Sequence, residues 1–478
     1  MSKQAQTVVV GAGPGGYAAA FRAADLGQKV ILIDPLENPG GVCLHWGCIP
    51  SKTLLHVVKV KDEAREAKQW GLSYAEPEVD LDRLRSFKDN VVKKLTGGLS
   101  QLVKQRKIEH IHGRARFTSD SELAVVLNDG GEETVTFEHA IIATGASPAG
   151  LPNVDVESDR VLYAKTALEL AEIPKTLLVV GGGYIGLELG SVFSKLGSEV
   201  TVVEMMPGIM PGADRDLVAI FEKQNRGVFK EILTSTVVDS IEEDEDGLQV
   251  TMKSSEGEEG SRKSAAYANV LMTVGNRPNS GELSLEAAGI ETDDRGFVSV
   301  DVHRRTSKPN IFAIGDVAGP PLLAHKATHE GKIAAEVIAG MKSAYDPAAI
   351  PSVEYTDPEI AWAGITEEQA REQELDVETA SFPWAASGRA VAMGAASGKT
   401  KIIVDRASKR VLGVGIAGRS AGDLISEGVL AIEMGALVED LALTVHPHPT
   451  LSETLMEAAE VFLGSATHIY RPREDGKK

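Results

Sequence analysis

Short apolar runs separated by glycine-rich turns and helical stretches organise the first half of the chain. Val8–Val10 and Val30–Ile33 have the length and composition of buried strands, and residues 17–26 between them have the spacing of a helix. The same order returns at Leu177–Val180 and Val200–Val203. A strand, a helix and a second parallel strand form a βαβ unit, so the pattern predicts two such units.

The two units are copies separated by a constant offset of 170 residues. Each has the pattern Gly-x-Gly-x-x-Gly, in which the first glycine makes the turn, the second admits a pyrophosphate and the third packs helix on strand. The helix N-terminus adds N–H donors for the phosphates. Two purely structural turns are the alternative, but the complete βαβ context favours two dinucleotide sites. The matching positions are Gly11 and Gly181, Gly13 and Gly183, Gly16 and Gly186, Leu26 and Leu196, Gly27 and Gly197, Val30 and Val200, and Asp34 and Glu204.

The acidic residue that ends each second strand indicates which nucleotide binds. Asp34 and Glu204 can accept hydrogen bonds from ribose hydroxyls, whereas a 2′-phosphate requires a nearby arginine. The first arginine after Glu204 is Arg215. The sequence therefore predicts NAD rather than NADP as the nicotinamide nucleotide.

Further strands and helices follow the two units. Three segments combine an apolar run or turn residues with a glycine, which indicates strand ends at domain boundaries. They are Ile141–Gly145, Gly275–Asn279 and Ile311–Asp316. The region after Pro351 mixes strands and helices. Its expected elements are strands at 401–404 and 411–416 and helices at 421–434 and 450–462.

Composition and charge narrow the function classes. The chain has 478 residues, 43% of them hydrophobic, and a formal net charge of −20. Such an acidic protein is a poor general ligand for nucleic acid or anionic membranes, while a basic protein partner would suit it. Its apolar runs are shorter than the ~20 residues of a membrane span, and the start MSKQAQT lacks the features of a signal peptide. We therefore expect a cytoplasmic protein with no contact with nucleic acid or membrane; an organellar form that has lost its presequence is the alternative.

The only two cysteines, Cys43 and Cys48, follow directly after the first predicted unit. Five positions on a regular helix span ~7.5 Å along the axis, too far for a disulfide. One cysteine must therefore lie in a loop or distorted turn, and Pro50 places a helix start at about Cys48. A positive helix end would stabilise a Cys48 thiolate. Two unrelated buried thiols or a labile metal site are the alternatives; two ligands do not close a zinc shell, so no metal site is predicted.

A histidine pair near the C-terminus offers a catalytic base. A histidine oriented by a carboxylate can remove a proton from a thiol near neutral pH, and His446 and His448 are both followed by Glu453. Thr450 and Glu453 also form the pattern of a capping box, so Glu453 could serve only the following helix. The residues alone do not distinguish the two histidines.

The cysteine segment 40–52, GGVCLHWGCIPSK, resembles the active-site segment of the pyridine nucleotide-disulfide oxidoreductases. The similarity continues along nearly the whole chain. Its further segments are ATG at 143–145, GGGYIGLELG at 181–190, IFAIGDV at 311–317, LAHKATHEG at 323–331, YTDPEIAW at 355–362, FPWAASGRA at 382–390 and HPHPTLSE at 446–453. His45-Trp46 departs from the usual family pattern, which leaves the packing beside the cysteines open.

This resemblance implies an α/β fold with two Rossmann-like dinucleotide-binding domains, for FAD and for NAD, and a C-terminal α+β dimerisation domain. The implied domains are 1–149 for FAD and the redox disulfide, 150–278 for NAD, 279–349 as a central domain that completes the FAD site, and 350–478 as the interface. Within the family, the resemblance is greatest to members that oxidise dihydrolipoamide with NAD. Glutathione or mercuric reductases, and a non-catalytic redox sensor, are the alternatives.

The resemblance also implies roles for individual residues. Cys43 would exchange with dihydrolipoamide, Cys48 would face the flavin, and His448, oriented by Glu453, would be the base. Lys52 would contact the flavin and pair with Glu188, and Asp316 would bind the ribitol and phosphate of FAD. The remaining implied contacts are Gly11, Gly13, Gly16, Asp34, Gly41, Val42, Ala115, Gly145 and Ala324 for FAD, and Gly181, Gly183, Ile185, Gly186, Glu204, Val237 and Gly275 for NAD.

The implied partners are a second copy of the chain, lipoyl domains, and a basic subunit-binding module on a lipoyl-bearing acyltransferase of a 2-oxo acid dehydrogenase complex. The sequence does not indicate which 2-oxo acid complex, or glycine cleavage system, the enzyme would serve.

Overall fold

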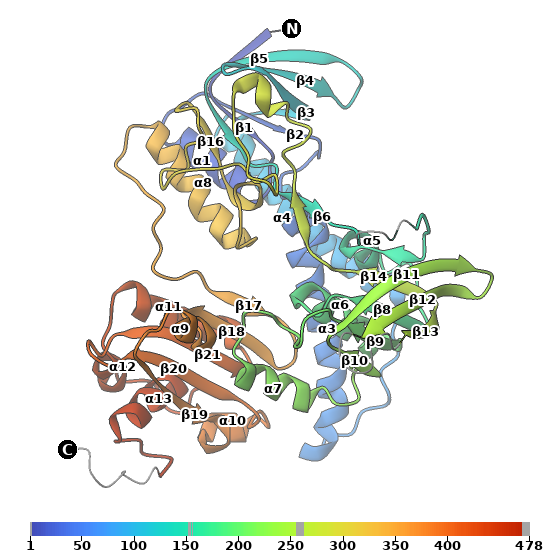
Figure 1. The fold of residues 1–478 in the computed structure, drawn as a ribbon, viewed down its shortest axis with the longest axis vertical. Coiled ribbons are helices and arrows are strands. Elements are labelled where there is room, and N and C mark those ends of the chain that lie inside the picture. The colour runs from blue at the N-terminus through green and yellow to red at the C-terminus, as the bar shows by residue number, and fades with distance from the viewer. Residues whose placement is uncertain (1, 152–153, 155, 255–261, 471–478) are drawn as a thin grey trace.

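A computed structural model describes residues 2–151, 154, 156–254 and 262–470 of the chain. Figure 1 shows an N-terminal sheet, a second sheet with a projecting hairpin, and a C-terminal sheet coloured orange to red. Within the described ranges, every helix is too short or too polar to cross a bilayer.

The first sheet combines strands from both ends of the first 313 residues. Its central strand β1 pairs in parallel with β2 and β5, and β16 adds in parallel to β5 although the whole second sheet lies between them in sequence. Helices α1 and α8 cover it side by side, and a Cβ at Gly331 of α8 would lie 2.4 Å from the Gly15 carbonyl oxygen of α1. The elements are β1 (Ser2–Val10), α1 (Pro14–Asp25), β2 (Val30–Asp34), β3 (Glu109–Ser119), β4 (Glu122–Leu127), β5 (Glu132–Ile142), β16 (Ile311–Ala313) and α8 (Ala324–Ile338).

The second sheet is parallel in the order β10-β9-β8-β14-β7. An antiparallel three-stranded sheet projects from it, and residues 244–247, of which the first three are acidic, form the tip between its first two strands. The elements are β7 (Val161–Leu162), α5 (Ala164–Glu169), β8 (Thr176–Val180), α6 (Tyr184–Leu196), β9 (Glu199–Val203), α7 (Arg215–Gln224), β10 (Glu231–Leu233), β11 (Thr236–Asp244), β12 (Gly247–Ser254), β13 (Arg262–Tyr267) and β14 (Asn269–Met272).

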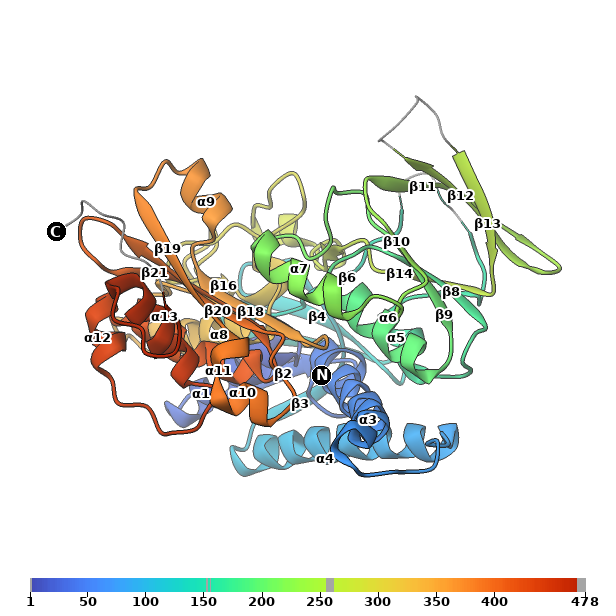
Figure 2. The ribbon, with the colours of Figure 1, turned by 90° about the horizontal axis from the view of Figure 1, so that it is seen from below.

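The chain connects the two sheets twice, and the two connections lie side by side. The outgoing strand β6 (Ala146–Pro148) pairs antiparallel with the returning strand β15 (Asn276–Pro278). Three α-helices lie between β2 and β3. The first two contain the cysteines, and the second and third are the long blue helices of Figures 1 and 2. They are α2 (Gly41–Trp46), α3 (Cys48–Glu66) and α4 (Leu81–Gln105).

The C-terminal sheet is antiparallel in the order β17-β18-β21-β20-β19. Its core includes the fully buried Trp384, whose indole N–H donates to the Thr400 hydroxyl at 3.0 Å. The elements are β17 (Ser352–Glu354), β18 (Glu359–Gly364), α9 (Glu367–Glu372), β19 (Val377–Pro383), α10 (Gly388–Ala392), β20 (Lys399–Asp405), β21 (Val411–Gly418), α11 (Ala421–Glu433), α12 (Val438–Leu443) and α13 (Glu453–Leu463).

The α/β fold with two Rossmann-like units and a C-terminal α+β region is confirmed. Two predicted boundaries were wrong. The first strand begins at Ser2, because polar residues 2–7 pair with β5. The last helix begins at Glu453 rather than at Thr450. Thr450 lies in the preceding loop, where its N–H donates to the Glu453 carboxylate.

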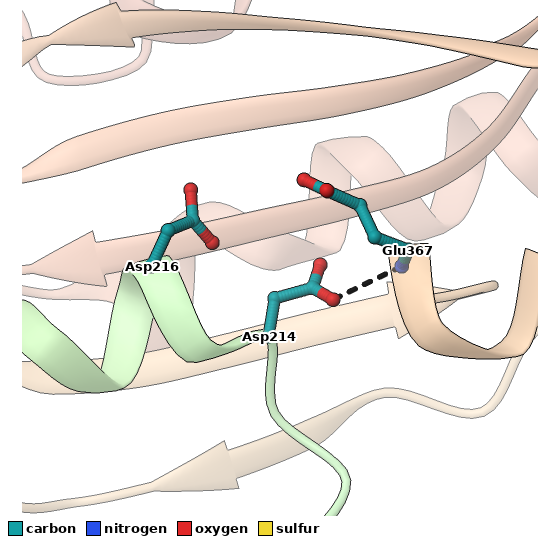
Figure 3. Close-up of side chains that lie close together, drawn as sticks. All are labelled: Asp214, Asp216 and Glu367. Carbon is teal, nitrogen blue, oxygen red and sulfur yellow. Dashed lines mark hydrogen bonds between the residues drawn. The ribbon is translucent and has the colours of Figure 1, made fainter. Parts of the chain in front are cut away.

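A buried lysine joins the second sheet to the C-terminal sheet. Figure 3 shows the carboxylates of Asp214, Asp216 and Glu367 close together at the starts of α7 and α9. Lys401 is 1% exposed, and its Nζ lies 2.7, 2.7 and 2.8 Å from these three carboxylates. The Lys401 ammonium therefore offsets part of the negative charge of the cluster and links the two regions.

Candidate active site

The first glycine turn is shaped for a close ligand. Gly11 has φ +100°, and a Cβ there would lie 2.3 Å from the Ala143 carbonyl oxygen. A Cβ at Gly16 would lie 1.8 Å from the Gly11 carbonyl oxygen, so the start of α1 packs directly on the turn. A Cβ at Gly13, in contrast, meets only Gly41 Cα at 3.9 Å, so the second glycine faces space. This is the shape that a pyrophosphate requires.

The second turn repeats this geometry. Gly181 has φ +110°, and a Cβ there would lie 2.5 Å from the Thr273 carbonyl oxygen. A Cβ at Gly186 would lie 2.1 Å from the Gly181 carbonyl oxygen, while none of the described atoms lies within 4 Å of a Cβ at Gly183. In the described structure no side chain caps α1 or α6, so the first N–H groups of both helices remain available to phosphate.

The acidic residues at the strand ends are held in equivalent ways. Asp34 accepts hydrogen bonds from the N–H groups of Ala12 at 2.7 Å and Leu36 at 2.8 Å. Glu204 accepts from the N–H groups of Gly182 at 2.6 Å and Met206 at 2.8 Å. Burial raises the pKa of Asp34. Both carboxylates are thereby fixed at the edge of a glycine turn, where a ribose would lie.

The cysteines lie on either side of a break between two helices. Cys43 is within α2, and Cys48 is the first residue of α3 after the Gly47 break. The Cys43 thiol donates to the Cys48 sulfur, and this hydrogen bond is the main reason that the pKa of Cys48 is lowered to about 7. Burial opposes the shift, and the positive charge of Lys52 supports it. The pKa of Cys43 is raised correspondingly. Cys48 is therefore the thiolate of the pair near neutral pH.

An ion pair lies one helical turn beyond Cys48. Lys52 Nζ donates to both carboxylate oxygens of Glu188, at 3.0 and 2.7 Å, and the Glu188 side chain is 3% exposed. The Tyr355 N–H donates to Glu188 Oε1 at 3.0 Å, and Lys52 Nζ lies 4.5 Å from the centre of the Tyr355 ring. Three elements, α3, α6 and the loop after β17, thus converge on one carboxylate.

Asp316 lies at the junction of β16 and α8. It is in a short helical turn after Ile314, and burial raises its pKa. The neighbouring Lys326 donates to the carbonyl oxygens of Gly315 and Gly319 at 3.2 and 2.9 Å and pairs with the fully buried Glu330. Ala324, predicted beside Asp316, is the first residue of α8.

The structure distinguishes the two histidines. His446 uses both ring nitrogens: Nδ1 contacts the Thr444 carbonyl oxygen at 2.8 Å and Nε2 contacts Glu427 at 2.7 Å. His448 contacts Glu453 through Nδ1 at 2.9 Å and is 71% exposed. Its Nε2 is therefore the nitrogen free of protein contact among the described atoms, which suits a base that receives a proton from an incoming molecule.

Glu453 both contacts His448 and accepts a hydrogen bond at the start of the following helix, which are the two roles considered for it. Its Oε1 contacts His448, while its Oε2 accepts from the Thr450 N–H at 2.7 Å. Burial alone would raise the pKa of Glu453, but these two hydrogen bonds outweigh it and hold the pKa below its ordinary value. The carboxylate therefore stays charged and can orient the ring.

The remaining predicted residues lie around the two glycine turns. Gly41 contacts the first turn, where a Cβ on it would lie 2.6 Å from Gly13 Cα. Val42 is exposed and Ala115 is buried in β3, whereas Val237 is 41% exposed at the start of β11. Gly145 and Gly275 directly precede β6 and β15, the strands that connect the two sheets, and both have positive φ with open space beside them. Ile185 is in α6.

The structure brings Cys43, Cys48, Lys52 and Glu188 together, but not the histidine. His448 precedes α13, and both views of the chain separate α13 from α3. The sequence reasoning missed Tyr355 and the Lys326–Glu330 pair. The pair had a detectable signal, because a lysine and a glutamate four positions apart on a helix can form an ion pair.

Comparisons with known proteins agree with this geometry. Residues 5–331 match the family model described as pyridine nucleotide-disulphide oxidoreductase, and residues 350–459 match its dimerisation domain. A protein named dihydrolipoyl dehydrogenase from Haemophilus influenzae is 49% identical over 98% of both chains. Another protein of that name, from Vibrio cholerae, is 47% identical over the full length of both.

The fold also matches a solved structure. LpdA from Mycobacterium tuberculosis superposes with a TM-score of 0.87 at 26% identity, covering 96% of this chain and 99% of LpdA. The chain belongs to the pyridine nucleotide-disulphide oxidoreductase family.

Proposed function

We propose that the protein is an FAD-containing dihydrolipoyl dehydrogenase that oxidises protein-bound dihydrolipoamide and reduces NAD to NADH. The observation that carries this function is the Cys43–Cys48 pair beside the Lys52–Glu188 ion pair, at the first of two dinucleotide turns. The full-length similarity to proteins of that name supports it.

Both cofactors fit the described residues. The first turn, with Asp34, Gly41 and Asp316 around it, would hold FAD; the second, with Glu204, would hold NAD. The open faces of Gly13 and Gly183 admit the pyrophosphates. FAD, when bound, accepts electrons from the dithiol and supplies them as hydride to NAD. The other proposed contacts are Gly11, Gly16, Val42, Ala115, Gly145 and Ala324 for FAD, and Gly181, Ile185, Gly186, Val237 and Gly275 for NAD.

The protein side chains carry out a thiol–disulfide exchange. One thiolate of dihydrolipoamide attacks Cys43 Sγ of the oxidised pair, the Cys43–Cys48 bond breaks, and Cys48 leaves as a thiolate. The second substrate thiol then attacks the substrate sulfur bound to Cys43, which releases lipoamide and Cys43. His448 Nε2 receives the proton, while Glu453 holds the other ring nitrogen. Lys52 supports the Cys48 thiolate electrostatically.

The site requires two copies of the chain. The dimerisation domain at 350–459 indicates a homodimer. Because His448 and the cysteines are separated within one chain, we infer that His448 acts on the cysteines of the partner subunit. This arrangement makes each active site dependent on both subunits.

Replacing His448 tests the proposal. His448→Gln should lower oxidation of dihydrolipoamide by roughly 10²–10⁴-fold, the usual contribution of a general base, and should leave flavin reduction by NADH within a few-fold. His446→Gln is the matched control and should lose far less, since its ring nitrogens are already engaged. Equal losses in both half-reactions would contradict His448 as the base, and no dihydrolipoamide activity in the unmodified protein would contradict the function.

Subunit mixing tests the shared site. Dimers formed between Cys43→Ser and His448→Gln chains contain one complete active site if His448 acts across the interface, and should regain part of the activity. If activity does not return on mixing, each site is built within one chain.

We further propose that the dimer binds lipoyl domains and a basic subunit-binding module on an acyltransferase. The net charge of −20 supports this interaction. Its affinity should fall steeply as salt rises, because exposed charges are screened within ~8 Å at physiological ionic strength. Salt-independent binding in a titration would contradict an electrostatic docking surface.

A further inference from the structure

A buried carboxyl group without a hydrogen-bonded partner lies behind the active site. Glu354, the last residue of β17, is 4% exposed. Its Oε2 has no hydrogen-bond partner among the described residues. An ionised carboxylate in such a place is costly, so the group favours its protonated form unless a charge compensates it.

The following residue connects Glu354 to the Lys52–Glu188 ion pair. The Tyr355 N–H donates to Glu188 Oε1 at 3.0 Å, and the Tyr355 ring lies under Lys52 Nζ at 4.5 Å. The main chain at β17 is therefore fixed against the pair. Glu354 interacts electrostatically with both Glu188 and Lys52, so a change in charge at Glu354 acts on the pair.

The charged and titratable groups that face Glu354 come from three helices. Helix α6 contributes Glu188 and Tyr184, α3 contributes Lys52, and α7 contributes Arg215. The Arg215 guanidinium does not compensate Glu354 by pairing with it, because its nitrogens donate to backbone carbonyl oxygens. These acceptors are Ile209, Met210 and Ala213, each at 2.7 Å.

Burial and then the charge of Glu188 raise the pKa of Glu354 to about 8, against the weaker opposing effects of Arg215 and Lys52. Because the pKa is raised, the carboxyl is neutral below about pH 8 and ionises as the pH rises through that value.

We propose that Glu354 is a positioning residue that stores a proton beside the Lys52–Glu188 pair and, when it releases the proton, places a second negative charge on the pair. With Glu354 neutral, Lys52 faces one carboxylate. With Glu354 ionised, a second negative charge acts on Lys52, and the electrostatic support of Lys52 for the Cys48 thiolate weakens. Added negative charge there also opposes hydride arrival from NADH.

The inference rests on the proposed function only in placing a flavin next to this pair. Two measurements on the FAD-loaded dimer separate it from that function. Infrared difference spectra between pH 7 and pH 9 detect the protonated carboxyl of Glu354 without turnover. Stopped-flow reduction of the flavin by NADH over the same range detects its effect and needs no dihydrolipoamide.

In the unmodified protein, the carboxyl C=O band should disappear as the pH rises from 7 to 9, and the reduction rate constant should fall about tenfold with an inflection near pH 8. Glu354→Gln should lack both changes and keep the rate observed at pH 7. Glu354→Asp should retain a titration. Glu66→Gln is the matched control: Glu66 has a pKa raised by burial and lies at the far end of α3, so this variant should behave like the unmodified protein.

An infrared transition and a rate profile that persist unchanged in Glu354→Gln would overturn the proposal. If that variant fails to fold, the unmodified protein and Glu354→Asp still decide, because the absence of a carboxyl band lost near pH 8 in both would also overturn it. If the titration is found but dihydrolipoamide is not oxidised, the proposed function fails and the role of Glu354 stands.

Discussion

The two glycine turns differ less in their own geometry than in what covers them. Gly11 and Gly181 have similar φ values, and each would collide with a carbonyl oxygen of a neighbouring strand if it carried a side chain. Asp34 and Glu204 each bind two N–H groups at the same relative positions. The two turns therefore have the same backbone geometry and the same hydrogen bonds to their acidic residues.

The surroundings are different. The first turn is covered by α2, since Gly41 packs on Gly13, and by α8, which packs on α1. The second turn is followed by Met205 and Met206, which are 66% and 49% exposed, and Tyr184 beside it is 39% exposed. The same phosphate-binding loop can thus serve a retained or an exchangeable nucleotide, and the covering elements decide which.

The largest expected effect comes from adding one methyl group to each turn. Gly11→Ala should yield protein without flavin. Gly181→Ala should remain yellow but lose roughly 100-fold in its use of NAD, since a displacement of about 1 Å at a binding loop costs this much. Flavin absorbance and steady-state kinetics measure the two outcomes. The comparison fails if both variants lose the same cofactor.

Two other repeated glycines provide the control. Gly27 and Gly197 also have positive φ, but no described atom lies within 4 Å of a Cβ on either. Gly27→Ala and Gly197→Ala should therefore keep both cofactors and lose only about 1–2 kcal/mol of stability from the backbone conformation.

A smaller effect concerns nucleotide choice. Glu204→Gln should lower the preference for NAD over NADP at least about tenfold, because a carboxylate facing a 2′-phosphate costs several kcal/mol. The measurement is kcat/KM with each nucleotide. Asp34→Asn, the matched change at the first turn, should affect flavin retention and leave the NAD-to-NADP ratio of kcat/KM unchanged. If Glu204→Gln also leaves this ratio unchanged, the Glu204 carboxylate does not select between NAD and NADP.

The smallest effect concerns the thiolate found only beside the first turn. In the reduced protein, alkylation of Cys48 by iodoacetamide, followed by mass spectrometry, should rise with pH around a midpoint of about 7. Lys52→Met should move this midpoint upward by about one unit, because a nearby positive charge favours the thiolate. Lys59→Met, on the same helix, should not move it. A midpoint unaffected by Lys52→Met would mean that the hydrogen bond from Cys43, and not the charge of Lys52, lowers the pKa of Cys48.

Features set by local sequence could be predicted, and features set by packing could not. The glycine turns, their acidic partners and the helix start at Cys48 follow from short motifs. Local residue patterns did not distinguish His446 from His448, and only the family resemblance favoured His448. The structure gives the physical reason, because Glu427, which engages His446, lies 19 residues away. Likewise, Glu354 gives no signal in the sequence: its burial arises only when α3, α6 and α7 meet at β17.

The addition of β16 and α8 to the first sheet has a consequence for synthesis. A nascent chain that has emerged only as far as β6 has the first glycine turn but lacks the helix that packs on α1. At typical translation rates of ~5–20 residues per second, the missing pieces arrive on the order of ten seconds or more later, after the entire second sheet. We therefore expect flavin capture to wait until the nicotinamide-binding unit has left the ribosome, and incomplete chains to stay colourless.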